Sequence, residues 1–364
     1  MKQVLLVKMS SMGDLVHSFP ALTDAARQGY RFDWVVEEGF VDLATRHPAV
    51  DRIYPIALRR WRKRPLASMG QFRKFRRDLQ GQHYAKVLDA QGLVKSAVVA
   101  RLAQTDSIVG LATNSAREGL ASRFYNERHE ISWQQHAIDR LRLLFAAALS
   151  YEVDLSKIDA TQLAPVEETH AIQGSSADPA RSSVVLLQGT SWPSKEYPPQ
   201  GWRELVVELA ARGESDILML SGNTTEHARA KQIARSLENS STQTASGPLL
   251  QTPMPESLSA VIDRISNASL VIGVDSGLTH LAATLGVPTL GLYGATAVQR
   301  TGARGPKARN MVSSFGCAPC LQRQCSYRGA AQSIKGEAVQ PACFAQWSAT
   351  DLLDAVADVW RVGS

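Results

Sequence analysis

One carboxylate near the start of the chain stands where a catalytic base could work. Asp14 ends the segment Ser10-Ser11-Met12-Gly13-Asp14, which follows an apolar run at Val4–Val7 and precedes a helical pattern. Open α/β sheets build their sites at the carboxyl ends of strands. Two interpretations stay open: Asp14 caps the helix, or it is a general base facing a cleft. The segment lacks G-x-G-x-x-G spacing, so it does not predict a dinucleotide site.

A second polar segment opens a helical pattern in the other half of the chain. Asp275-Ser276-Gly277-Leu278-Thr279-His280 follows the apolar run Leu270–Val274. Free backbone N–H groups at such a helix start, together with the helix dipole, attract a diphosphate. His280 would lie within the first helical turn, close to that anion. The alternative is a capped core helix with a buried Asp275.

A third segment, Gly189-Thr190-Ser191-Trp192-Pro193-Ser194-Lys195, follows the apolar run Val184–Leu187. Two hydroxyls and a lysine at the end of a strand suit phosphate oxygens. A solvated turn is the alternative, because lysine side chains are mostly exposed.

Nine Lys or Arg residues and no acid lie between Arg59 and Arg77. They are Arg59, Arg60, Arg62, Lys63, Arg64, Arg73, Lys74, Arg76 and Arg77. A solvated helix face often explains a run of charges, but like charges this dense repel, and Arg clusters bind phosphate groups. Aromatic residues are few in the segment, and nothing resembles a nucleic-acid module. The segment therefore predicts an anionic substrate rather than a nucleic acid.

All four cysteines lie late in the chain, at Cys317, Cys320, Cys325 and Cys343. Secreted proteins stapled by disulfides do not usually show this distribution. A C-x-x-C pair with two further thiols predicts a tetrahedral structural site for iron or zinc. Four reduced thiols in a cytosolic loop are the alternative.

Apolar runs alternate with helical patterns in both halves, which predicts an α/β fold with parallel sheets. The expected strands are Val4–Val7, Trp34–Val36, Ile53–Ile56, Val87–Leu88, Ile108–Leu111, Val184–Leu187, Ile217–Leu220, Leu270–Val274 and Thr289–Tyr293. The expected helices include one with Leu15, Phe19, Leu22 and Ala26 on one face, then Trp202–Ala211, Thr225–Leu237, Leu258–Ile265, His280–Leu285 and Ala349–Trp360.

The polar stretch 166–183 reads as a linker between two α/β halves, and such halves place a ligand cleft between them. We therefore expect domains at 1–165 and 184–348, with a C-terminal helix at 349–364 that packs back. Net charge is +6, and no run approaches the ~20 apolar residues that span a bilayer. The N-terminus has no secretory pattern, and no amphipathic membrane anchor is evident, so we expect a cytoplasmic protein.

Seven stretches, in order along most of the chain, resemble the bacterial lipopolysaccharide heptosyltransferases of glycosyltransferase family 9, above all the heptosyltransferases I. They cover residues 8–25, 32–40, 57–63, 88–97, 115–126, 134–140 and 273–283. The resemblance implies a GT-B fold, in which two Rossmann-like domains face one another across a cleft. It implies an ADP-heptose donor bound by the C-terminal domain. The implied acceptor is a Kdo-modified lipid A precursor, met by an enzyme that touches the anionic cytosolic face of the inner membrane.

The resemblance also implies roles for single residues. Asp14 matches the catalytic base of an inverting transfer. Donor binding falls to Thr190, Ser191, Lys195, Glu226 (at the ribose), Asp275, Ser276, Gly277 and His280. Acceptor binding falls to Arg59, Arg60, Arg62, Lys63, Arg117 and His136.

The chain departs from common patterns in two places. It contains no D-x-D motif for a divalent cation, which predicts metal-independent transfer, with Lys195 and helix N-termini facing the diphosphate. The turn Tyr293–Ala297 lacks the Pro and Asp common in the family. Clustered cysteines occur in related enzymes that glycosylate autotransporter proteins, so a protein acceptor is the main alternative. A non-catalytic sugar-nucleotide-binding protein is the other.

Overall fold

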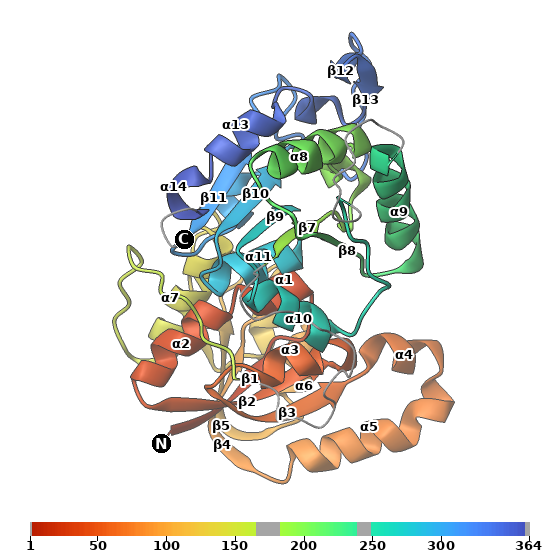
Figure 1. Cartoon of the computed structure of the whole chain (residues 1–364). Coiled ribbons are helices and arrows are strands. Elements are labelled where there is room, and N and C mark those ends of the chain that lie inside the picture. Colours follow the sequence, from red (N-terminus) through yellow and green to blue (C-terminus); the bar gives the residue numbers. More distant parts are fainter. Residues whose placement is uncertain (1, 165–182, 239–248, 361–364) are drawn as a thin grey trace. The chain divides into compact units, whose positions relative to one another are not determined.

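The computed structural model describes residues 2–164, 183–238 and 249–360. The chain divides into two compact units, Met1–Thr169 and His170–Ser364 (Figure 1). Each contains a parallel sheet with helices, so the predicted α/β class is confirmed. The predicted linker, 166–183, lies outside the described residues except for Ser183.

The first unit has a parallel sheet of six strands in the order β3-β2-β1-β4-β5-β6. The strands are β1 (Lys2–Val7), β2 (Tyr30–Glu37), β3 (Val50–Ile56), β4 (His83–Asp89), β5 (Gln104–Leu111) and β6 (Glu127–His129). The order reverses between β1 and β4. Ligands of open α/β sheets bind outside the carboxyl ends of the strands at such a reversal.

Helices pack on both faces of this sheet, because successive strand side chains point to opposite sides. The helices are α1 (Met12–Val16), α2 (Phe19–Arg27), α3 (Val41–Thr45), α4 (Leu58–Lys63), α5 (Pro65–Leu79), α6 (Val94–Ala100) and α7 (Ala137–Leu149), with 3₁₀ turns at Glu38–Phe40 and Gly119–Phe124. Leu5 and Val7 share one core with α5 and α6. On the other face, Phe19 of α2 meets Trp34 and Phe145 of α7 meets Phe32.

The single helix expected after Asp14 is two helices, α1 and α2. Pro20 stands at the start of α2 and has no N–H to continue a helix from α1, and its ring would clash with the carbonyl four residues back. Leu15, Phe19 and Leu22 are nevertheless all buried, as their spacing predicts.

The second unit has a parallel sheet of five strands in the order β11-β10-β9-β7-β8, which reverses between β7 and β9. The strands are β7 (Val184–Leu187), β8 (Ile217–Leu220), β9 (Leu270–Val274), β10 (Thr289–Tyr293) and β11 (Ala308–Val312), with a separate hairpin of β12 (Gln332–Ile334) and β13 (Glu337–Val339). The helices are α8 (Pro199–Ala211), α9 (Thr224–Glu238), α10 (Leu258–Ser266), α11 (Gly277–Thr284), α12 (Val298–Thr301), α13 (Ala349–Asp354) and α14 (Ala357–Trp360), with 3₁₀ turns at Pro193–Lys195 and Ala342–Phe344.

The C-terminal segment is two short helices, α13 and α14, rather than the one helix expected. Leu352, Leu353 and Val356 join the core that contains Trp202 of α8. Arg212, just after α8, also forms an ion pair with Asp354 at 2.9 Å. The segment thus packs back onto its own unit. In the part of the chain that the structure describes, no helix is long and apolar enough to span a membrane.

Candidate active site

Asp14 lies in α1, which follows the carboxyl end of β1 after a short loop. Ser11 is the N-cap of α1, and its backbone N–H and hydroxyl donate to Asp14 Oδ2 at 2.8 and 2.9 Å. One carboxylate oxygen therefore completes a capping box. The side chain is 38% exposed, which leaves Asp14 accessible to a substrate. Capping and catalysis are thus compatible in one residue.

Lys8 lies beside this carboxylate. Its ammonium is almost fully buried, donates to the Ala90 carbonyl at 3.0 Å and lies 4.0 Å from Asp14 Oδ1. Burial would raise the pKa of the Asp14 carboxyl, but the charge of Lys8 and the hydrogen bonds from Ser11 outweigh it and hold that pKa below its ordinary value. Asp14 is therefore ionised at neutral pH, as a base must be.

The loop after β4 holds the Asp14 loop in place across the sheet reversal. Gln91 Oε1 accepts from the backbone N–H of Met9 and Ser10 at 2.9 and 3.2 Å, and its amide donates to the Ser10 carbonyl at 2.6 Å. Asp89 is fully buried and accepts from Gln91 N–H, the Ser96 hydroxyl and the Tyr125 hydroxyl. Because Gln91 fixes both sides of the Ser10 backbone, the start of α1 has little freedom to move.

Two of the predicted acceptor residues lie near Asp14. The ring of His136, at the N-cap of α7, is 6.0 Å from that of His17, and His17 lies one turn beyond Asp14. Arg117 follows β5, next to Gly92, and its charge acts on Lys8. The structure thus brings Asp14, His136 and Arg117 to one edge of the sheet.

The other predicted acceptor residues, Arg59, Arg60, Arg62 and Lys63, lie on α4, which follows the carboxyl end of β3. Arg60 pairs with Glu38 at 2.8 Å and donates to Gln71. Arg59 acts electrostatically on Glu37, whose N–H bonds the Met9 carbonyl. Among the described residues, no hydrogen bond or ion pair joins these four side chains to Asp14. They share its sheet edge but not its immediate surroundings.

Asp275 organises the corresponding edge of the second unit. Its buried carboxylate lies 2.7 Å from Lys195 Nζ and 3.1 Å from His280 Nε2, and it accepts from the Thr296 hydroxyl at 2.7 Å. Burial would raise the pKa of Asp275, but His280 and Lys195 reverse the effect and hold it well below its ordinary value. Lys195 is only 15% exposed, whereas the solvated-turn alternative assumes an exposed lysine.

The start of α11 lies beside this cluster. Ser276 is the N-cap and its hydroxyl accepts from Thr279 N–H, while Gly277 is the first helical residue. The first N–H groups of a helix have no partner within it and attract anions. The Thr190 hydroxyl donates to the Asp275 carbonyl at 3.2 Å, and Ser191 is exposed nearby in sequence. The β7 and β9 loops thus meet where the strand order reverses.

Glu226 lies in the first turn of α9, next to the β7 loop. Its carboxylate accepts from Gly222 N–H at 2.7 Å and from the Asn223 amide at 2.9 Å. A Cβ on Gly189 would approach Glu226 Oε2 to 2.7 Å, so the Gly189 backbone lies directly against the Glu226 carboxylate. Glu226 is thus placed within the same group of loops as Thr190.

The four cysteines line one small pocket, together with Ser194, Gly294 and Ala295. All are free thiols, and burial and then the three neighbouring thiols raise the pKa of Cys343 to about 12. No group of three or more His, Cys, Asp or Glu residues within 2–164, 183–238 and 249–360 is arranged to hold a metal ion. The predicted iron or zinc site is therefore not preformed.

The cysteine loop nevertheless supports the donor-side loops. Ser194 N–H bonds the Arg323 carbonyl at 3.2 Å, and the Ser194 hydroxyl donates to the Gln322 carbonyl. Leu321 N–H bonds the Ala295 carbonyl at 2.8 Å. Ser194 precedes Lys195 and Ala295 precedes Thr296, so the loop fixes the backbone beside both partners of Asp275.

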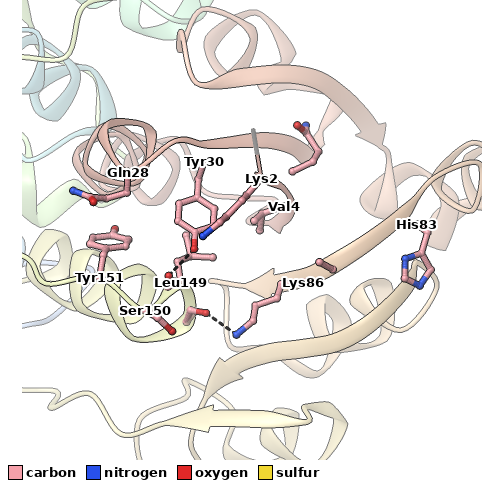
Figure 2. A pocket seen from close by; sticks show the side chains of 12 residues that line it. Lys2, Val4, Gln28, Tyr30, His83, Lys86, Leu149, Ser150 and Tyr151 are labelled. Atoms are coloured by element: carbon pink, nitrogen blue, oxygen red, sulfur yellow. Dashed lines mark hydrogen bonds between the residues drawn. The ribbon is translucent and has the colours of Figure 1, made fainter.

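A cavity of about 660 Å³ lies at the opposite edge of the first sheet, at the amino ends of β1, β2 and β4 (Figure 2). Its cations already have partners. Lys86 donates to the Ala148 carbonyl at 2.8 Å and pairs with Glu127, and Lys2 lies over the Tyr30 ring. Tyr30 and Lys86 hold the end of α7 through the Leu149 and Ala148 carbonyls, so we do not assign this cavity to the site.

Three residues with clear roles in the site are not evident from the sequence. In the sequence, Lys8 only marks the end of an apolar run, and Gln91 has the pattern of a loop residue. Thr296 lies in the turn Tyr293–Ala297, which lacks the Pro and Asp of the pattern described above. Their common signal is position, since each follows the carboxyl end of a parallel strand in the sheet. Which partner each one meets depends on the folded structure.

Comparisons with known proteins agree with this geometry. The model of "Glycosyltransferase family 9 (heptosyltransferase)" matches residues 72–331. The chain is 42% identical over 355 residues to lipopolysaccharide heptosyltransferase 1 of Pseudomonas aeruginosa, covering 94% of this chain and 93% of that protein. It is similar to E. coli heptosyltransferase WaaC with ADP, at 37% identity and a TM-score of 0.73, covering 85% of this chain and 92% of that one. WaaC with ADP-2-deoxy-2-fluoro heptose gives 36% identity and a TM-score of 0.70, over 85% and 93% of the two chains. The chain therefore belongs to glycosyltransferase family 9, the heptosyltransferases, and is a glycosyltransferase.

Proposed function

We propose that this enzyme transfers L-glycero-D-manno-heptose from ADP-heptose to the Kdo region of the lipopolysaccharide inner core, with inversion at the anomeric carbon. The observation that carries the proposal is the buried cluster of Lys195, Asp275 and His280 at the start of α11, a place suited to a diphosphate. The names of the relatives supply the sugar and the nucleotide: WaaC was solved with ADP and with a fluorinated ADP-heptose.

On the donor side, the diphosphate gains negative charge as the bond to the anomeric carbon breaks. Lys195 and the first N–H groups of α11 would stabilise that charge. Asp275 holds Lys195 at 2.7 Å and so aims its ammonium. Thr190, Ser191 and Glu226 complete the proposed donor contacts, with Glu226 at the ribose.

On the acceptor side, Asp14 accepts the proton of the attacking hydroxyl as the new glycosidic bond forms. The acceptor oxygen must then lie within about 3 Å of the carboxylate. His136 and Arg117 would orient the acceptor near Asp14, while Arg59, Arg60, Arg62 and Lys63 would bind its anionic groups farther away. ADP leaves with the electrons of the broken bond, and Lys195 with the first N–H groups of α11 would neutralise its charge, as a divalent cation does in other enzymes.

We place the enzyme in the cytoplasm, in peripheral contact with the inner membrane, because a Kdo-lipid A acceptor is membrane-bound. The basic α4 segment is then occupied by acceptor phosphates rather than by nucleic acid.

A structural iron or zinc ion at Cys317, Cys320, Cys325 and Cys343 is a separate part of the proposal. Its support is that all four cysteines line one pocket and all four are free thiols. Binding would require the thiols to draw closer and lose their protons. Elemental analysis of the purified protein should find about one equivalent; a content far below that would end this part alone.

The experiment that tests the function offers ADP-heptose with a panel of acceptors and analyses the products by mass. Addition of one heptose to Kdo-bearing lipid A is expected, and addition to a polypeptide instead would favour an autotransporter-type enzyme. Absence of any product from the whole panel, with ADP binding intact, would contradict the proposed acceptor. EDTA should leave the rate unchanged; loss that added divalent cation restores would contradict metal-independent transfer.

A further inference from the structure

Helix α5, Pro65–Leu79, has two chemically distinct faces. Its inner face carries Phe75 and Leu79, which are buried in the core of the first unit. The opposite face carries Leu66, Met69, Arg73 and Arg77. The last three follow Leu66 by three, seven and eleven residues, so all four side chains point the same way. Leu66 is 85% exposed and Met69 is 45% exposed. Exposed Arg76 lies seven residues after Met69, hence beside it on the helix. We call the set Leu66, Met69, Arg73, Arg76 and Arg77 the outer face of α5.

The arginines of this outer face form no ion pair with any residue that the structure describes. Lys74 pairs with Asp78 on the side of the helix. Arg73, Arg76 and Arg77 are exposed and have no ion-pair partner in the portion of the chain that the structure describes. Figure 1 shows α4 and α5 as a helical hairpin that extends beyond β3, at the edge of the first unit's sheet. Exposed Arg62 and Lys63 of α4 add to the same positive region.

Exposed apolar side chains flanked by arginines favour one kind of partner. Single exposed leucines are common and need no explanation, but Leu66 and Met69 lie one turn apart in a segment that carries no acid before Asp78. A second copy of this face would repel the first by its charge. A helix with an apolar patch and many cations lies readily at the surface of an anionic bilayer, where each cation gains interaction energy.

We propose that the outer face of α5 docks the protein onto an anionic lipid bilayer, with Leu66 and Met69 among the headgroups and Arg73, Arg76 and Arg77 against lipid phosphates. This inference rests on the proposed function only in that a lipid-linked acceptor lies at the same surface. Docking itself needs neither donor nor acceptor. It also revises the expectation that the chain has no amphipathic anchor.

The test measures binding of the full chain to vesicles that contain no acceptor, by co-sedimentation. Vesicles of phosphatidylcholine with about 30% phosphatidylglycerol should bind the protein, and vesicles of phosphatidylcholine alone should not. Arg73→Gln/Arg76→Gln/Arg77→Gln should weaken binding roughly 100-fold, since each cation contributes about a factor of five. Leu66→Ser/Met69→Ser should weaken it about 10-fold, by removing apolar contact with the headgroup region.

A charge-matched control removes three exposed cations of the second unit by Lys231→Gln/Arg235→Gln/Lys335→Gln. This control should bind vesicles as the natural protein does; equal weakening by both triple variants would reduce the effect to net charge and overturn the proposal. Failure of the natural protein to bind anionic vesicles would overturn it as well, as would a Leu66- and Met69-dependent dimer in place of vesicle binding.

Heptose transfer to a water-soluble Kdo acceptor should be unaffected by the α5 variants. Vesicle binding without transfer activity would contradict the proposed function and leave docking intact.

Discussion

Each unit places a carboxylate beside the reversal in strand order, after β1 on one side of it in the first unit and after β9 on the other side in the second, and the two carboxylates differ in their surroundings. Asp14 follows β1 where the first sheet reverses and is 38% exposed, and its Oδ1 lies 4.0 Å from Lys8 Nζ. Asp275 follows β9 where the second sheet reverses, is buried, and has both oxygens engaged by Lys195, His280 and Thr296.

The difference separates two kinds of work. A base must keep an oxygen available for a substrate proton, and Asp14 Oδ1 is available. A carboxylate whose two oxygens are both held in hydrogen bonds and ion pairs loses those interactions when it accepts a proton. It can instead hold a lysine and a histidine in fixed positions. We therefore propose that the first unit carries out proton transfer and that the second binds the leaving group.

Asp14→Asn should have the largest effect on turnover, because the amide cannot accept the acceptor's proton. We expect kcat to fall by roughly 10²–10⁴-fold, measured in steady-state assays with both substrates. Asp42→Asn is a matched control, since Asp42 also lies in the first turn of a short helix, α3. A near-normal kcat for Asp14→Asn would reduce Asp14 to a helix-capping residue.

Lys195→Met should come next, with kcat/KM for the donor down by about 10²–10³-fold. The variant removes the cation beside the diphosphate and leaves Asp275 buried with weaker compensation. It should also lower the free energy of unfolding by about 3 kcal/mol, as measured by urea denaturation. Lys195→Arg should recover part of the stability. An unchanged donor kcat/KM would show that Lys195 is structural only.

Lys8→Met should move the acid limb of the pH–rate profile rather than abolish activity. Lys8 lowers the pKa of Asp14, so its removal raises that pKa, and the ionised base is lost at a higher pH. His17, Asp89, Arg117 and Arg140 also act on this pair and are retained in the variant. An acid limb at the natural position, in a variant that folds normally, would contradict coupling between Lys8 and Asp14.

Thr296→Val should have the smallest effect, because Lys195 and His280 still hold Asp275. Loss of one buried hydrogen bond corresponds to about 1 kcal/mol, or about fivefold weaker ADP binding by calorimetry. Thr296→Ser keeps the hydroxyl and should bind ADP normally. Equal weakening in both variants would mean that the methyl group matters, not the hydrogen bond.

The sequence predicts the parts of the fold that depend on buried apolar runs. Leu270–Val274 and Thr289–Tyr293 match β9 and β10 at both ends, because both strands are buried throughout. β6 and β11 escape prediction since their sequences, ERH and ARNMV, are short or polar and only partly buried. Local patterns carry no signal for such strands, which form by pairing with a neighbour already in place.

The residues of the candidate site also divide into those that the sequence predicts and those that only the structure reveals. Asp14, Lys195 and Asp275 are predictable because each follows an apolar strand in a motif with chemical groups. Lys8 approaches Asp14 through the turn that follows β1. The contacts of Thr296 with Asp275 and of the cysteine loop with Ser194 join segments that are farther apart in the sequence. Only the folded structure shows which groups meet.

Calorimetric titration of ADP into Asp14→Asn and Asp275→Asn, side by side, tests the division of labour most directly. We predict that Asp14→Asn binds ADP with the affinity of the natural enzyme, whereas Asp275→Asn, with Lys195 and His280 released, binds it at least tenfold more weakly. Equal affinities in the two variants, or weak binding in Asp14→Asn alone, would contradict the assignment of proton transfer to one unit and leaving-group binding to the other.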